Sequence, residues 1–327
     1  MKKTILSIGI TILFVGMSFN SISGFQIDNK TINPSNRDNT LYVGGNGSGN
    51  YSEIQDAVDD ASPGDTVFVY HGIYNKKEEY DYQLVKISKP IKLIGEDKNT
   101  TILNGSGKYS VVRIHSGGVE LCGFTVRKDG GETYSGAGVH IWTSEMDKLN
   151  NIKVYDNILK DNNLGLTIYD CKNSIFHNNI FLNNYVGVKI LNSVNCSVFN
   201  NYFIENSNAI GLEAQTTITI EHNEFKDGGR GIGLGTCKGV TIQSNNFINN
   251  NIHANFIREG QFVNYKNLLK YTQIWKSNYW DNWQIKLSKP IFGMNLLYFP
   301  IGGLFWFTIF IPAIEFDKTP AQEPYDI

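Results

Sequence analysis

The chain has 327 residues, a formal net charge of −2 and only 18% charged residues. It therefore lacks the strong positive field that binding to a nucleic-acid backbone requires, and we expect no nucleic-acid partner. Its 32 glycines and abundant asparagines suit tight turns better than long helices. The length allows one large domain or two ordinary ones.

The N-terminus has the features of a secretory signal peptide. A positively charged start is followed by the uncharged, mostly apolar run Ile5–Met17, and Ser21 and Ser23 have the spacing of a cleavage site. Residues 1–23 are therefore predicted to be a signal peptide, and residues 24–39 a linker. A retained membrane anchor is the alternative, although the run is short for a bilayer span of ~20 residues. On both interpretations the rest of the chain is exported, as a secreted or cell-surface protein.

A short helix is predicted near the start of the mature chain. Ser52 and Gln55 have the spacing of a capping box, in which two side chains bond free backbone N–H groups at the start of a helix. The helix is expected to continue to Ala61 with one apolar side, and Pro63 and Gly64 end it. It is a candidate cover for the open apolar end of the stacked coils described next.

A 22-residue repeat dominates the middle of the chain. Asparagine recurs at this period, with apolar residues at fixed positions before and after it. The asparagines are Asn157, Asn179, Asn201, Asn223 and Asn245. Within each coil, apolar and polar residues alternate over short stretches, which is the periodicity of strands. Because 22 residues leave no room for crossover helices, each strand must stack on its equivalent in the next coil.

The repeat therefore predicts an all-β fold, a right-handed parallel β-helix over residues 40–258, with an irregular C-terminal cap over residues 259–327. The asparagine column is predicted to be structural. An asparagine amide can bond its own turn as well as the asparagines in the coils above and below, which forms a ladder. A polar excursion at residues 128–135 breaks the period, and loops inserted into a solenoid often gather on its binding face.

The uncharged segment Leu296–Ile314 allows two interpretations. It is long enough for a transmembrane helix. Pro300 and Pro312, with two glycines between them, favour instead a cap that folds over the C-terminal end of the coils and shields Phe247 and Phe256. Contact with a membrane is expected only through this segment or through an uncleaved signal peptide.

Cysteine is sparse. The four cysteines form no C-x-x-C pair, and no two of them stand obviously opposite each other in the repeat: Cys122, Cys171, Cys196 and Cys237. Disulfides are open to an exported chain, but we expect small buried residues instead.

Several segments resemble exported parallel β-helix proteins, a group that includes NosD-like proteins and the carbohydrate-binding and sugar-hydrolysis domain. These segments are Tyr42–Gly45, Tyr51–Val58, Pro63–Val67, Gly72–Tyr74, Lys89–Gly95 and the Asn-Asn-x-Phe repeats. The closing segment Phe316–Ile327, with Asn278–Trp283 before it, resembles archaeal, methanogen-type members. The resemblance covers nearly the whole mature chain. It implies the fold, together with a monomeric module that associates with a polysaccharide or a cell-surface glycan.

The resemblance also suggests activities to test against the residues. Pectin methylesterases carry Gln-Asp-Thr and Asp-Phe-Ile-Phe-Gly segments, polygalacturonases a Gly-His-Gly segment and alginate epimerases Asp-Pro-His, and this chain contains none of them. NosD-like proteins are linked to the maturation of copper centres. Copper favours clusters of His, Cys and Met, whereas the six histidines here are dispersed, so a copper role is the least favoured interpretation.

One corner of the repeat could carry sugar chemistry. Glu205 and Asp227 are 22 residues apart and should stack ~5 Å from each other, with Glu224 and Arg230 close in sequence. Two carboxylates at that separation could form a catalytic acid/base pair or a calcium site, and the arginine could hold a uronate carboxylate. The alternative is a solvated turn column in which acids and amides alternate. Apart from calcium, no cofactor is suggested.

Aromatic residues on the predicted outer surface suggest sugar binding. Tyr134 and Trp142 flank the polar excursion, while Tyr155 and Phe199 share one outward column. Aromatic rings with amides nearby suit the apolar faces and hydroxyl groups of sugars, although ordinary packing of strand faces is equally compatible. The sequence favours a carbohydrate-associated binding or structural module without catalysis. The alternative is a polysaccharide lyase or glycoside hydrolase acting on an acidic polysaccharide.

Overall fold

The computed structural model describes residues 39–75, 83–106, 109–129, 136–143, 148–214, 217–261, 264–268, 270–300 and 306–327, all within the compact unit Arg37–Ile327. The predicted signal peptide, nearly all of the predicted linker and the candidate sugar-binding residue Tyr134 lie outside the described residues.

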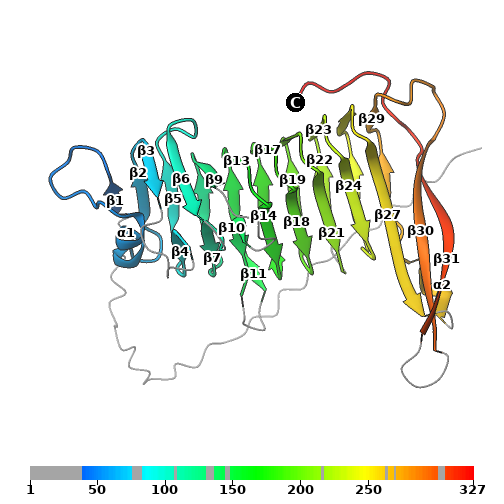
Figure 1. Cartoon of the computed structure of the whole chain (residues 1–327), viewed down its shortest axis with the longest axis horizontal. Helices are drawn as coiled ribbons and strands as arrows, with labels where there is room; N and C mark the ends of the chain where they lie inside the picture. The colour runs from blue at the N-terminus through cyan, green and yellow to red at the C-terminus, as the bar shows by residue number, and fades with distance from the viewer. Residues whose placement is uncertain are drawn as a thin grey trace, which may run out of the picture. The chain divides into compact units, whose positions relative to one another are not determined.

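Parallel strands stack coil upon coil in three series, each named here after one of its strands (Figure 1). The β14 face contains β4 (Val85–Ile87), β7 (Val112–Ile114), β10 (Ala137–Ile141), β14 (Leu164–Tyr169), β18 (Val186–Leu191), β21 (Asn208–Glu213), β24 (Arg230–Gly235), β27 (Ile252–Gln261) and β30 (Lys289–Pro300). The β16 face contains β2 (Thr66–Val69), β5 (Lys92–Gly95), β8 (Glu120–Cys122), β12 (Lys153–Tyr155), β16 (Ile175–His177), β19 (Val194–Phe199), β22 (Thr217–Glu221), β25 (Thr241–Gln243) and β28 (Ile274–Lys276). The β13 face contains β3 (Gly72–Asn75), β6 (Thr101–Ser106), β9 (Thr125–Asp129), β13 (Ile158–Lys160), β17 (Ile180–Leu182), β20 (Tyr202–Ile204), β23 (Glu224–Lys226), β26 (Asn246–Ile248) and β29 (Tyr279–Trp280). The remaining elements are β1 (Thr40–Val43), α1 (Ile54–Asp60), β11 (Leu149–Asn150), β15 (Cys171–Lys172), α2 (Tyr265–Leu268) and β31 (Trp306–Asp317).

The predicted right-handed parallel β-helix is confirmed, and its register follows the 22-residue repeat. Ile158 pairs with Ile180, which pairs with Tyr202 in the coil beyond. Alternate residues of each short strand point into the core. The large interior side chains form a stack in which Phe203 lies 4.8 Å from Phe181 and 5.0 Å from Phe225, measured between ring centroids. Each such buried ring contributes roughly 1.5–3 kcal/mol to folding.

The asparagines of the repeat lie in one fully buried column at the corner between the β16 and β13 faces. The side-chain amide of Asn179 donates to Val154 O at 2.9 Å, to His177 O at 3.0 Å and to Asn201 Oδ1 at 3.1 Å. One amide therefore bonds the coil before it, its own turn and the coil after it. This arrangement satisfies backbone groups that a tight buried corner would otherwise leave without partners.

A second asparagine ladder lies at the next corner, between the β13 and β14 faces. Asn184 donates to Leu159 O at 2.9 Å and to Asn206 Oδ1 at 3.0 Å, and Asn162 bonds Asn184 in the same way. The sequence analysis did not identify this ladder, although its members share the 22-residue spacing.

The N-terminal helix α1 lies where the sequence places it, with Ile54, Ala57 and Val58 buried. The predicted capping box is wrong. The N-cap residue is Glu53, and no side chain caps the helix. Gln55 instead bonds the backbone of Lys86 in both directions, with Lys86 N to Gln55 Oε1 at 2.7 Å. It thereby ties the helix to strand β4 of the first coils.

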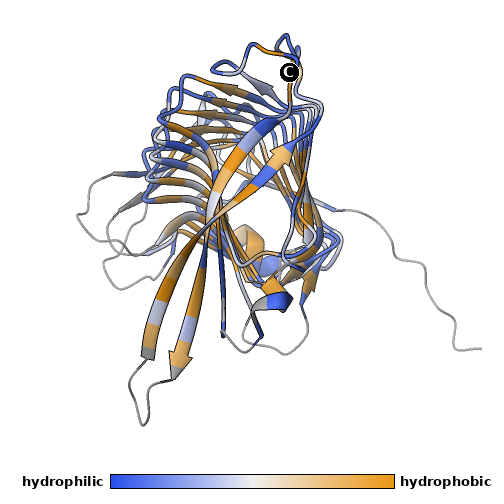
Figure 2. Ribbon diagram, turned by 90° about the vertical axis from the view of Figure 1, so that its right-hand side faces the viewer, coloured by the Kyte–Doolittle hydropathy of each residue, from blue (hydrophilic) through white to orange (hydrophobic). Residues whose placement is uncertain are grey.

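The C-terminal segment differs from the prediction. Residues 296–300 belong to β30 and residues 306–314 to β31, which pair as an antiparallel hairpin, so the segment is not an irregular cap. No helix among the described residues is long and apolar enough to span a bilayer. Parallel pairing also continues past residue 258, because β28 and β30 extend the β16 and β14 faces. The hairpin projects past the coils, and many of its side chains are hydrophobic (Figure 2).

The hairpin covers the core through its base, where Ile291 joins the core and Ala313 packs against it, and not by folding over Phe247. Phe247 is covered by the indole of Trp280, with centroids 4.2 Å apart, and Phe256 lies against the backbone of Gly293. The outer hairpin residues remain exposed, Phe310 at 63%. Buried carboxylates at its base fasten the hairpin to the last coil, since Glu315 accepts a hydrogen bond from Trp275 Nε1 at 2.6 Å and pairs with Arg258.

Candidate functional site

Of the four residues predicted to form a catalytic or calcium site, the structure brings two together at one corner, Glu205 and Asp227. Glu205 and Asp227 occupy the same corner of neighbouring coils, both exposed and both with a left-handed φ of 55°. They line a shallow hollow of about 460 Å³ with Asn249, whose amide donates to Asp227 Oδ1 at 2.6 Å. Asparagine and aspartate tolerate this left-handed backbone well, so the corner itself explains much of the column's composition.

Glu224 and Arg230 do not join this pair. Glu224 stands on strand β23 of the β13 face. Arg230 stands on the β14 face, where its Nε donates to Asn208 Oδ1 at 2.6 Å and one Nη to Asn255 Oδ1 at 3.3 Å. Within the described ranges, no three His, Cys, Asp or Glu side chains are grouped as a metal site would require.

The predicted sugar-binding residues Tyr155 and Phe199 belong to a stack of rings on the β16 face. His177 lies between them, with centroid distances of 5.1 Å and 4.9 Å and interplanar angles of 2° and 1°. In such a stack the ring faces contact one another, and only the ring edges point toward solvent. A sugar ring would need an open aromatic face, so this stack offers a poor platform for one.

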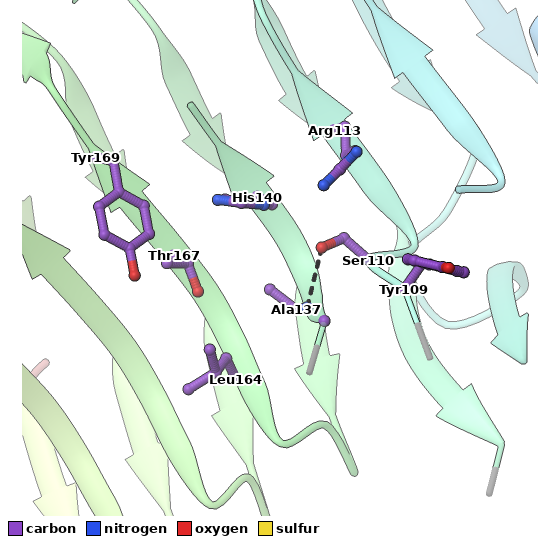
Figure 3. A pocket seen from close by; sticks show the side chains of 9 residues that line it. Tyr109, Ser110, Arg113, Ala137, His140, Leu164, Thr167 and Tyr169 are labelled. Carbon is purple, nitrogen blue, oxygen red and sulfur yellow. Dashed lines mark hydrogen bonds between the residues drawn. The ribbon is translucent and has the colours of Figure 1, made fainter. Parts of the chain in front are cut away.

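A pocket of about 290 Å³ lies on the outer surface of the β14 face, over β7, β10 and β14 (Figure 3). Arg113 pairs with His140, and His140 with Thr167, so the three side chains stand side by side on consecutive coils. Tyr109 and Tyr169 also line the pocket. The strand alternation that buries Val112, Val139 and Leu166 directs these polar neighbours outward.

Three buried side-chain atoms that belong to residues of this pocket have no hydrogen-bond partner in the protein. In the part of the chain that the structure describes, five buried side-chain nitrogen or oxygen atoms lack a hydrogen bond, and three of them are Arg113 Nε, His140 Nε2 and Thr167 Oγ1. Thr167 is only 2% exposed. Because buried polar groups are nearly always satisfied, three exceptions on adjacent coils make this pocket a candidate place for a polar ligand.

The charge of Arg113 sets the electrostatics of the pocket. Burial lowers the pKa of His140 to about 4, and the nearby positive charges of Arg113 and His115 add to this effect. The pKa of His115 is also lowered, first by burial and then by Arg113 and Lys86. Near neutral pH His140 is therefore uncharged, and one of its ring nitrogens can accept a hydrogen bond while the other donates. Arg113 stays charged.

Trp142 does not line this pocket, but its ring contacts the ring of His140, which does, and it is the one described member of the predicted sugar-binding set found nearby. Its ring centroid is 6.4 Å from that of His140 and 5.8 Å from that of His115, and 38% of the residue is exposed. His140 also contacts Tyr169, at 5.7 Å. The pocket thus combines a cation and neutral hydrogen-bonding groups, with an exposed aromatic ring beside it.

The 22-residue repeat does not predict the column of Arg113, His140 and Thr167, because their coils depart from that period. The paired positions are 27 residues apart, from Arg113 to His140 and again from His140 to Thr167. The next step, from Thr167 to Lys189, returns to 22. Lys86 stands 27 residues before Arg113, so a search at the period of 27 would have found the column.

The fold is that of a parallel β-helix protein with an outward pocket on one face of its coils. Comparison with family models matches residues 58–284 with NosD, described as a periplasmic copper-binding protein, and the chain belongs to this family. No curated protein sequence matches it significantly.

Solved structures with similar coils are distant. ORF18 of Geobacillus virus E2 is 14% identical with a TM-score of 0.46; the match covers 75% of this chain and 57% of the viral protein. An alginate lyase from Paenibacillus sp. FPU-7 is 14% identical with a TM-score of 0.42, covering 63% of this chain and 91% of the lyase. Pectin methylesterase from carrot is 12% identical with a TM-score of 0.43, covering 73% of each chain.

The donor groups in the described residues do not fit a copper site. All four cysteines are buried free thiols, as the sequence analysis expects, and they lie within the coils rather than at the pocket. His115 and His140 are near each other, but the positive charge of Arg113 acts on both. A cation would be repelled there, so the pocket is better suited to a neutral or anionic ligand.

Proposed function

We propose that this member of the NosD family is an exported, non-catalytic glycan-binding module, acting as a monomer at the cell surface or in the secreted fraction. Its binding site is the pocket formed by Arg113, His140 and Thr167, with Trp142 beside it. Support for export comes from the predicted signal peptide and from the family's description as periplasmic.

The observation that carries the proposal is the row of unpartnered buried polar atoms on three adjacent coils, beside an exposed indole. A sugar presents both hydroxyl groups and an apolar C–H surface. The hydroxyls would bond the side chains of Arg113, His140 and Thr167, whose unpartnered atoms are covered in the free protein and would turn toward the ligand on binding, while the C–H surface would lie against Trp142. The pocket volume of about 290 Å³ is at the small end for ligand sites and suits one sugar residue of a longer chain.

A glycan array probed with the purified mature protein tests this function. The key variant is Thr167→Val, which removes the buried hydroxyl at nearly constant shape. The matched control is Thr219→Val, which removes a hydroxyl from strand β22 of the β16 face. We expect the wild type and Thr219→Val to bind the same glycans and Thr167→Val to bind them at least tenfold more weakly. Absence of glycan binding, or equal binding by all three proteins, would overturn the proposal.

A polysaccharide lyase acting on uronate chains is the second candidate, and the composition of the same pocket favours it. Arg113 could hold the uronate carboxylate, and neutral His140 could take the proton from the carbon beside that carboxylate. The electron pair then forms a carbon–carbon double bond as the bond to the glycosidic oxygen breaks, and that oxygen takes a proton from Tyr109 or Tyr169. The ultraviolet absorbance of an unsaturated product tests this candidate. Activity lost in His140→Gln would establish it, and no absorbance change with any uronate polymer would remove it.

A further inference from the structure

The Arg113 pocket is part of one outward side-chain column that runs along the β14 face from β4 to β27. Strand pairing places one residue of each coil in this column, in register from coil to coil. Its members are Lys86, Arg113, His140, Thr167, Lys189, Gly211, Gly233 and Asn255. None of them is acidic.

Cations recur along this column. Lys86, Arg113 and Lys189 are members of it, and the side chain of Arg230 extends over it from three residues before Gly233 on strand β24. A Cβ atom added at Gly233 would lie 2.8 Å from Arg230 Cζ, so the guanidinium occupies the space above that glycine. At ~4.8 Å per coil, Lys189 lies ~14 Å and Gly233 ~24 Å from Arg113 along the stack.

The contacts that these cations make within the protein do not neutralise most of their positive charge. Arg230 is held by the neutral amides of Asn208 and Asn255. Lys189 forms an ion pair with Glu213, with 3.4 Å between Nζ and Oε1. Among the described residues, the other three cations form no such pair. The pair of Lys189 and Glu213 is partly exposed and therefore weak. The surface between Lys189 and Arg230 is not covered by side chains, because no atom lies within 4 Å of a Cβ built on Gly211.

We propose that the bound glycan is an anionic polysaccharide that lies along the β14 face. One of its acidic groups enters the pocket at Arg113, and later acidic groups contact Lys189 and Arg230. This inference rests on the glycan-binding function proposed above. The pocket fits an anion because the guanidinium of Arg113 lines it and Arg113 Nε has no protein partner. Carboxylates of uronates and sulfate esters share this chemistry.

Single-stranded nucleic acid is a poorer occupant. It would require a series of open aromatic faces for its bases, and among the described residues near this pocket only Trp142 has an aromatic ring that is more than a third exposed. The net charge of −2 also gives no general attraction to a polyanion, so the attraction must be local to this column.

Binding of matched oligosaccharides by the mature protein tests the inference. The probes are an oligogalacturonate, its methyl-esterified neutral form, a sulfated oligosaccharide and a single-stranded oligonucleotide. We expect the wild type to bind one or both acidic sugars at least tenfold more tightly than the neutral form, with affinity falling as salt rises. Arg113→Gln should lose ~10–100-fold for the acidic probe and little for the neutral one. Arg113→Lys should retain part of the affinity, and Lys153→Gln on the β16 face should retain all of it.

The outcomes separate the two proposals. Equal binding of acidic and neutral sugars, unaffected by Arg113→Gln, would overturn the anionic inference while glycan binding stands. Tightest binding to the oligonucleotide would overturn it in favour of a nucleic-acid partner. No binding to any sugar would overturn both proposals. Preference for oligogalacturonate identifies carboxylates as the recognised group, and preference for the sulfated sugar identifies sulfate esters. Thermal melts of each variant check that loss of binding is not loss of folding.

Discussion

Asp317 ends the asparagine ladder by accepting a hydrogen bond from the side-chain amide of Asn278, with 3.1 Å between Nδ2 and Oδ2. The same carboxylate oxygen accepts from the backbone N–H of Asn278 at 2.9 Å and from the indole N–H of Trp280 at 3.2 Å. Asn278 in turn accepts from Asn245, the last member of the repeat, at 3.0 Å. In the last coil, a carboxylate of the hairpin strand β31 thus supplies the oxygen that a further asparagine would have given.

Replacement of Asp317 should be among the most destabilising single changes at the C-terminal end. Asp317→Ala leaves several buried N–H groups without an acceptor and should lower the free energy of unfolding by ~3 kcal/mol or more. Asp317→Asn keeps one side-chain oxygen at the site and should cost less. Urea denaturation of the three proteins measures the order. Equal stability of the alanine variant and the wild type would show that the ladder needs no terminal acceptor.

Loss of a ladder residue in mid-repeat should also be costly. Asn201→Ala removes the amide that bonds Phe176 O and Phe199 O, both at about 3 Å, and should lower the free energy of unfolding by ~1–3 kcal/mol. Ser207→Ala changes an exposed residue on the same coil and should stay within ~0.5 kcal/mol of wild type. If the two variants melt alike in denaturant, the ladder contributes little to stability.

The Thr167 hydroxyl should strengthen glycan binding while it lowers the stability of the free protein. Because Thr167 Oγ1 is buried without a partner, Thr167→Val removes a desolvated polar group and should stabilise the free protein by up to ~1 kcal/mol. The same variant should lose glycan binding. Denaturant melts without ligand measure the first effect. A loss of 1 kcal/mol or more would mean that the hydroxyl has an internal partner, and the pocket would then be a structural feature.

Acid should weaken the fold through His140. Its pKa falls from 6.5 to about 4 on folding, so the unfolded chain binds more protons between these pH values. The free energy of unfolding therefore decreases as pH falls from 6.5 to 4, by at most about 3 kcal/mol from this residue. Arg113, His115, Trp142 and Tyr169 surround the ring. Denaturation of the wild type and His140→Gln at pH 7, 5.5 and 4 measures the effect, and the free energy of unfolding should depend less on pH in the variant. Identical pH profiles of the two proteins would contradict a lowered pKa of His140 in the folded state.

Anion binding should reverse part of that shift. A carboxylate placed beside Arg113 offsets its charge and favours the protonated imidazole, so the pKa of His140 should rise in the complex. By linkage, affinity for an acidic sugar should then increase as pH falls from 7 toward 5. Calorimetric titration of the oligogalacturonate at both pH values measures the change, with the neutral ester as control. An affinity for the acidic probe that stays constant would place its charge away from His140.

The parts of the fold that follow one period could be predicted, and the parts that depart from it could not. Asn157, Asn179 and Asn201 share the 22-residue spacing of the strands, so the sequence predicts that they stack on one another in successive coils. Arg113 and His140 stand on 27-residue coils, so the 22-residue period does not predict that they share one column. Which outward residues lack partners also depends on neighbours in adjacent coils.

Local signals misled the prediction at both ends. Ser52 and Gln55 have capping-box spacing, but Gln55 bonds Lys86 of a strand 31 residues away, a contact that local spacing does not encode. At the other end, Leu296–Ile314 has no charge, which is equally compatible with a membrane helix, a buried cover or an apolar hairpin. The pairing of β30 with β27 favours the hairpin, and such pairing depends on the whole stack.

The most direct test of the central claim is NMR mapping of the isotope-labelled mature protein during titration with the oligogalacturonate and the sulfated oligosaccharide. The account predicts that amide shifts from at least one probe are largest in β7, β10 and β14, accompanied by shifts of the His140 ring and the Trp142 indole. Shifts centred on Tyr155 and Phe199 or on Glu205 and Asp227, or no shifts with any probe, would contradict it.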